Sequence, residues 1–152
     1  MDRKIIIIAI ALIAIGIGGY LLTYDSATEY NFSDISFKSH DTAIVENYTG
    51  YEDQGLHTFA AEETVIMELN YNEMSYDERD TNQNGWVFIK DEILSHSDGT
   101  KVIDGRTIYI VPNQRTQKTN YVTALKKNNR EFLIISNSSD ETIFIAESIK
   151  TY

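Results

Sequence analysis

The sequence predicts an α+β protein: an N-terminal transmembrane helix, then a small domain with a mostly antiparallel β-sheet and a C-terminal helix. Three observations support this. Residues 5–22 form an uncharged apolar run, several short β-type runs follow with turn residues between them, and a capping pattern precedes the last apolar segment. Strands do not alternate with helices, which argues against a parallel βαβ fold. Residues 23–152 are enough for one domain with a modest core.

The apolar run 5–22 predicts a membrane anchor. As a helix its 18 residues span about 27 Å, close to the roughly 30 Å of a bilayer core. Arg3 and Lys4 precede the run, and the next basic residue is Lys38. This asymmetry predicts residues 1–4 in the cytoplasm and the rest of the chain outside. A cleaved signal peptide is the alternative, but the run exceeds the usual 7–15 apolar residues, which favours an uncleaved anchor.

The charge balance restricts the class of partner. The chain carries 23 acidic and 13 basic residues, a formal net charge of −10. Such a surface repels phosphate backbones, which argues against nucleic acid, whereas cations and basic partners remain compatible. The chain contains no Cys, so disulfides, thiol catalysis and thiolate metal sites are excluded.

The first half of the outer region predicts a tether followed by strands. Residues 23–31 are polar without apolar periodicity and are expected to tether a domain spanning 32–152. Apolar and polar residues alternate through 64–72, the pattern of a half-buried strand. Shorter β-type runs precede it at 34–38, 42–48 and 57–61.

The pattern in the middle of the chain is compatible with more than one secondary structure. Residues 73–85 are polar with few apolar residues, and one or two helical turns fit their first part. The segment 86–94 is ambiguous. As a helix it places Trp86, Ile89 and Ile93 on one face, and as a strand it places Trp86 and Phe88 on one face and Val87 and Ile89 on the other. We favour the strand.

Two hairpins and a helix are expected in the last third. Asp104-Gly105 should join strands at 101–103 and 106–111, and Pro112 should end the second strand. Asn128-Asn129 should join strands at 121–126 and 131–136. Ser138 and Glu141 form a capping-box pattern that predicts a helix over 140–150. The segment 141–146 is also compatible with a strand.

One motif carries recognisable metal chemistry. Residues 80–85 fit the start of an EF-hand loop, D-x-[DN]-x-[DN]-G, in which oxygens at alternate positions converge on calcium. The Asp at the twelfth position resembles the calcium loops of dockerin modules. The alternative is a polar surface turn, because Asp, Asn and Gly favour turns for backbone reasons. The candidate ligands are Asp80, Asn82, Asn84, Trp86 (through its carbonyl) and Asp91.

The order of the segments resembles that of small uncharacterised membrane-anchored proteins of methanogenic archaea. The matching pieces are the basic start, the Ile-rich anchor, and residues 35–38, 104–111 and 121–149. The resemblance implies no known activity and no functional residues.

These features predict a single-pass membrane protein whose extracytoplasmic domain binds a partner in the cell envelope and is not an enzyme. A calcium-binding domain built on residues 80–91 is the second hypothesis. A membrane-tethered hydrolase is the third, and it requires a pocket in which acid and base groups converge.

Overall fold

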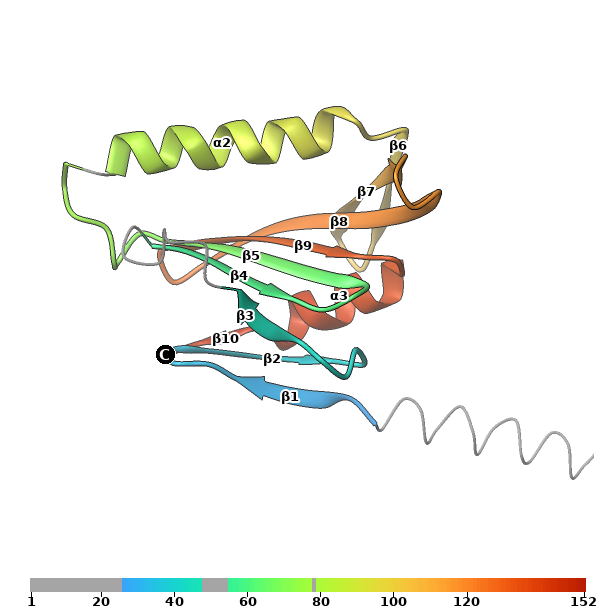
Figure 1. Ribbon diagram of the computed structural model, residues 1–152, viewed down its shortest axis with the longest axis horizontal. Coiled ribbons are helices and arrows are strands. Elements are labelled where there is room, and N and C mark those ends of the chain that lie inside the picture. The colour runs from blue at the N-terminus through green and yellow to red at the C-terminus, as the bar shows by residue number, and fades with distance from the viewer. Residues whose placement is uncertain (1–25, 48–54, 78) are drawn as a thin grey trace, which may run out of the picture.

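The computed structural model describes residues 26–47, 55–77 and 79–152. In this part of the chain two antiparallel sheets and two helices form a layered α+β domain (Figure 1). The larger sheet has seven strands in the order β3-β4-β5-β9-β8-β7-β6, and the smaller has three in the order β1-β2-β10. The bounds are β1 Thr28–Asn31, β2 Ile35–Ser39, β3 Val45–Asn47, β4 Leu56–Ala60, β5 Thr64–Asn70, α2 Arg79–Ser95, β6 Gly99–Ile103, β7 Arg106–Asn113, β8 Lys118–Lys127, β9 Arg130–Ser136, α3 Ser139–Ser148 and β10 Lys150–Thr151.

Each face of the larger sheet is covered by other elements (Figure 1). Helix α2 lies along one face, and α3 with the smaller sheet lies on the other. The alternation of strand side chains divides the central strand β9 between two cores: Phe132 and Ile134 face α3, whereas Leu133 faces α2. The central strand β9 is therefore buried on both sides, although the sheet is antiparallel.

The core on the α3 side is the larger of the two. It joins apolar residues of β2, β4, β5 and β9 to the inner face of α3, and they are all less than 9 % exposed. Its buried members are Ile35, Phe37, Ile44, Phe59, Ile66, Phe132, Ile134, Ile145, Ala146 and Ile149.

Helix α2 is held mainly by one aromatic side chain. Trp86 is 2 % exposed, and its Nε1–H donates to Glu131 Oε2 over 3.0 Å. Glu131 Oε1 also accepts from the hydroxyl of Tyr71 at 2.8 Å and from Lys126 Nζ at 2.8 Å. These donors lower the pKa of Glu131, although burial alone would raise it. The carboxylate of Glu131 is thus a polar anchor for α2.

Most of the predicted strands are confirmed. The runs at 34–38, 57–61, 64–72, 101–103, 106–111, 121–126 and 131–136 correspond to β2, β4, β5, β6, β7, β8 and β9. Both hairpin turns have the predicted left-handed residues: φ is +50° at Asp104 and +77° at Gly105, and +48° and +60° at Asn128 and Asn129. The run at 42–48 is a strand only over Val45–Asn47 among the described residues.

The C-terminal helix is also confirmed, but it ends earlier than expected. Ser138 is its N-cap, and its side chain accepts from the Glu141 backbone N–H. The helix stops before Ile149, which is extended (φ −59°, ψ 125°), because Lys150 and Thr151 pair with β2 as β10. The carboxylate of Glu141 does not complete a capping box, since the Ser138 N–H donates to Ser136 Oγ at 3.2 Å.

The strand expected over 86–94 is wrong. This segment belongs to helix α2, which begins at Arg79 in the second part of the polar stretch 73–85. In that helix Trp86, Ile89 and Ile93 share the face toward the sheet, as the helical alternative required, while Phe88 is 70 % exposed. The apolar face of the sheet beneath this segment stabilises a helix with one apolar side. Strand propensity reflects only the local sequence and does not include that tertiary contact.

Two boundaries are corrected as well. Residues 28–31 of the expected tether form β1 and pair with β2, so the folded domain begins before residue 32. Pro112 does not end its strand but pairs with Thr119 inside β7. Ile110 and Pro112 point toward the same edge of β7, and β6 reaches only as far as Ile110, so the missing N–H of Pro112 faces an uncovered edge.

The predicted anchor, 5–22, lies outside the described residues. Neither helix in the described part is long and apolar enough to span a bilayer.

Candidate functional site

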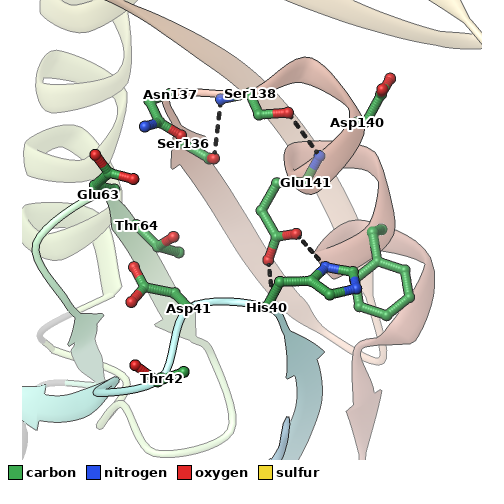
Figure 2. Close-up of a pocket in the computed structure, with 11 residues that line it drawn as sticks. His40, Asp41, Thr42, Glu63, Thr64, Ser136, Asn137, Ser138, Asp140 and Glu141 are labelled. Atoms are coloured by element: carbon green, nitrogen blue, oxygen red, sulfur yellow. Dashed lines mark hydrogen bonds and ion pairs between the residues drawn. The ribbon is translucent and has the colours of Figure 1, made fainter. Parts of the chain in front are cut away.

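A cavity lies where the start of α3 meets the end of β2 and the start of β5 (Figure 2). Its volume is about 490 Å³, within the range of small-molecule sites. Most of its lining residues are polar or charged, and they come from segments far apart in the sequence. The lining residues are His40, Asp41, Thr42, Glu63, Thr64, Ser136, Asn137, Ser138, Asp140, Glu141 and Phe144.

Glu141 connects α3 to the chain that follows β2. Its Oε2 accepts from His40 Nδ1 at 2.6 Å, and its Oε1 accepts from the Ser39 hydroxyl at 2.6 Å and the His40 backbone N–H at 2.8 Å. The His40 ring also packs on Phe144, with ring centroids 4.6 Å apart. These contacts fix the segment 39–41 as one wall of the cavity.

Asp41 is the least compensated charged group in this wall. Its backbone is held from both sides, because its N–H donates to Ser39 Oγ at 3.0 Å and its carbonyl accepts from the hydroxyl of Tyr30 at 2.5 Å. Its carboxylate oxygen Oδ2 is buried and has no hydrogen-bond partner among the described residues. In Figure 2 the carboxylate lies on the side of the chain that faces Glu63 and Thr64.

Thr64 forms the opposite wall. It is 2 % exposed, and its side chain lies in the cavity view beside Asp41 and Glu63 (Figure 2). Within the described residues its hydroxyl makes no hydrogen bond, whereas its backbone carbonyl accepts from Ala61. Its hydroxyl is thus a hydrogen-bonding group on the cavity wall with no protein partner among the described residues, and a ligand group or water can bind it.

The lining is acidic. It contains four carboxylates, Asp41, Glu63, Asp140 and Glu141, and no Lys or Arg. Glu63 pairs with Lys118 at 3.1 Å, and this contact lowers the pKa of the Glu63 carboxyl. Asp140 lies in the first turn of α3, where the helix dipole favours a negative charge. Among the described residues Asp41 forms no ion pair.

The hydroxyl groups at the start of α3 serve the backbone. Ser138 Oγ accepts from the Glu141 N–H at 3.4 Å, and Ser136 Oγ accepts from the Ser138 N–H. The Nδ1 side of the His40 ring is directed at Glu141 (Figure 2). The wall therefore offers hydrogen-bond acceptors to a bound ligand. Its described residues do not pair a nucleophile with a general base.

The candidate calcium ligands are not brought together. Asp80, Asn82, Asn84, Trp86 and Asp91 all lie in α2. Successive helical residues turn by about 100°, so side chains two apart point in different directions and do not meet at one cation. No group of three His, Cys, Asp or Glu residues suited to a metal ion occurs in the described part of the chain.

A second, partly buried polar cluster lies on the α3 side of the larger sheet, with Arg130 and Glu68 as its buried members. His57 bridges Glu46 Oε1 (3.0 Å from Nδ1) and Glu73 Oε2 (2.6 Å from Nε2). Arg130 bridges Glu68 and Asp34 over 2.8 Å and 2.7 Å. These contacts connect β3, β4, β5 and β9 to the segment before β2, and we interpret the cluster as structural.

Sequence reasoning missed both clusters. His40 and Glu141 are a hundred residues apart, and no spacing motif joins them. Glu68 occupies a polar position of an alternating strand, a pattern that predicts exposure to solvent, but the smaller sheet covers that face. Only the tertiary pairing could reveal these partners.

Comparison with known proteins adds no assignment: no family model matches the chain, and no curated protein matches it.

Proposed function

We propose that this chain is a single-pass membrane protein, anchored by residues 5–22, whose extracytoplasmic domain binds a component of the cell envelope in the cavity at the start of α3. The observation that carries the proposal is that the unpartnered polar groups of Asp41 and Thr64 line one cavity. Groups left unpaired in a folded protein cost free energy, and binding sites are where such costs are offset by a ligand.

The arrangement of elements also supports a binding module. The cavity is built from β2, β5 and α3, which share the largest core of the domain. Its walls are therefore held in place before a ligand arrives, which reduces the entropy lost on binding.

Membrane orientation is tested by single-cysteine labelling. Because the chain contains no Cys, the introduced thiol is the one site in the chain that a maleimide labels. Asp2→Cys reports on the N-terminus, and Arg115→Cys reports on the exposed turn after β7. In intact cells a membrane-impermeant maleimide should label the Arg115→Cys chain, and label the Asp2→Cys chain only after lysis. The opposite pattern would overturn the orientation, and release of the labelled chain by alkaline carbonate would overturn the anchor.

Binding at the cavity is tested by photo-crosslinking in the membrane. A photoreactive phenylalanine analogue placed at Thr42 or Asn137, both exposed at the rim, should yield the same adduct. The control position is Val87, which is 41 % exposed on α2, across the larger sheet. Equal labelling at all three positions, or labelling at Val87 alone, would count against the cavity.

A further inference from the structure

We infer that the cavity at the start of α3 binds an organic cation, an ammonium or guanidinium group, with Asp41 as its principal acceptor. The inference rests on the proposed function and names its ligand class. It follows from three observations on the described residues: an unpaired buried carboxylate oxygen on Asp41, a hydroxyl on Thr64 with no protein partner, and a lining without Lys or Arg.

The carboxylate of Asp41 is prepared to accept a donor. Oδ2 has no hydrogen bond to give up, so the group can turn about χ2 toward a donor in the cavity without breaking a contact. The backbone of Asp41, in contrast, is fixed by Ser39 and Tyr30. The carboxylate oxygens of Asp41 can therefore rotate while its backbone stays fixed, and this combination suits the binding of a small ligand group.

The charges around the cavity favour a cation over a neutral donor. The charge of Glu63 is shared with Lys118, and that of Glu141 is stabilised by donors from Ser39 and His40. The charge of Asp41 has no such compensation. A partly enclosed site with excess negative charge attracts cations, and hydrogen bonds between charged groups are about twice as strong as neutral ones.

The cavity has room for an organic group rather than a bare ion. Its volume of about 490 Å³ accommodates several non-hydrogen atoms. Thr64 lies near Asp41 and offers a hydroxyl oxygen to a second N–H of the same group. Phe144 adds an apolar wall for the carbon chain that carries the cation.

The test is calorimetric titration of the full chain in neutral detergent with agmatine and cadaverine, which carry guanidinium and ammonium groups. The uncharged 1,5-pentanediol serves as the matched probe. We expect saturable binding of the cations, weaker binding at high salt, and no binding of the diol.

Two variants remove single groups while keeping side-chain shape. Asp41→Asn should weaken cation binding about ten- to hundredfold, the usual effect of a charge-assisted hydrogen bond. Thr64→Val should weaken it by a smaller factor. The control Glu92→Gln makes the same carboxylate-to-amide change on exposed α2, across the larger sheet, and should bind like the wild type.

Thermal melting without ligand separates a binding role from a structural one. Because neither polar group has a partner to lose, Asp41→Asn and Thr64→Val should melt at or above the wild-type temperature. A lower melting temperature for both variants would identify the groups as structural and overturn the inference.

Other outcomes also overturn it. Equal cation binding by wild type and Asp41→Asn, no cation binding at millimolar concentration, or equal binding of the diol would each do so. These results leave the crosslinking test unaffected: rim adducts without cation binding would retain the proposed function and reject only the ligand class.

Discussion

Arg130 Nη1 donates to Glu68 Oε1 over 2.8 Å, and both side chains are almost fully buried, at 4 % and 1 % exposed. The two residues lie on neighbouring strands but are not directly paired, since Arg130 is opposite Asn70 and reaches diagonally to Glu68. Its Nη2 donates to Asp34, just before β2. Arg130 therefore holds β5 and β9 together through Glu68 and connects the larger sheet to the start of β2 through Asp34.

Removing one partner should destabilise the domain more than removing both. Arg130→Met leaves Glu68 charged and buried without a partner, and we expect a loss of about 3–5 kcal/mol in the free energy of unfolding. Arg130→Met with Glu68→Met should recover most of that loss, because well-packed apolar side chains replace a buried pair at little cost. Guanidinium unfolding followed by Trp86 fluorescence measures both. Equal losses in the single and double variants would contradict this account.

Stability should fall as pH rises from mildly acidic to alkaline values. Burial lowers the pKa of His57, but hydrogen bonds with Glu73 and Glu46 raise it more, so the net pKa lies above the ordinary 6.5. A group with a raised pKa in the folded state stabilises the fold fully below its unfolded pKa, and that contribution is lost as pH rises through the folded value. Thermal melting between pH 5 and pH 9 measures this trend. His57→Gln should flatten the curve, and an unchanged slope in that variant would remove His57 as its source.

At low pH stability should fall as the pH decreases, because of Glu131. The donors around it hold the pKa of this carboxyl below its ordinary 4.5, so its contribution is present above that value and is lost as pH falls through the folded pKa. Glu131→Gln should reduce the acid-induced loss and weaken the docking of α2, seen as a red shift of Trp86 emission. Glu92→Gln, an exposed carboxylate of α2, serves as the control and should leave the emission unchanged.

Substitution by alanine should change the free energy of unfolding in opposite directions at two glycines. Gly55 has φ +77°, and an added Cβ would lie 2.5 Å from the Asn70 carbonyl oxygen, so Gly55→Ala should destabilise by about 1–3 kcal/mol. Gly85 lies inside α2, and a Cβ there meets nothing within 4 Å. Gly85→Ala should therefore stabilise by about 0.5–1 kcal/mol. Chemical unfolding of both variants tests the pair, and destabilisation by Gly85→Ala would indicate that residues 79–95 are not helical.

Calcium should leave the domain unchanged. Asp80 and Asn84 lie on one face of α2, whereas Asn82 lies on the opposite face, so the three side chains do not enclose one cation. We therefore expect a flat titration of Trp86 emission and melting temperature up to millimolar calcium. Asp80→Ala should behave like the wild type. A saturable response that Asp80→Ala abolishes would restore the EF-hand reading of residues 80–91.

Local patterns in the sequence were sufficient for much of the fold. Alternation over 64–72 predicted β5, Asp104-Gly105 and Asn128-Asn129 predicted the two hairpin turns, and Ser138 predicted the start of α3. Each of these signals depends on residues within a few positions of one another, where side-chain period and backbone preference act directly.

Only the tertiary structure decided the remainder. Residues 86–94 carry both helix and strand signals, and the apolar sheet face that receives Trp86 favours the helix. The cavity joins His40 and Asp41 to Thr64 and Glu141, and the buried pair joins Glu68 to Arg130, across gaps that no local pattern spans. Strand order and the covering of both sheet faces set these contacts, because the burial of a polar residue depends on what packs over it and not on its neighbours in sequence.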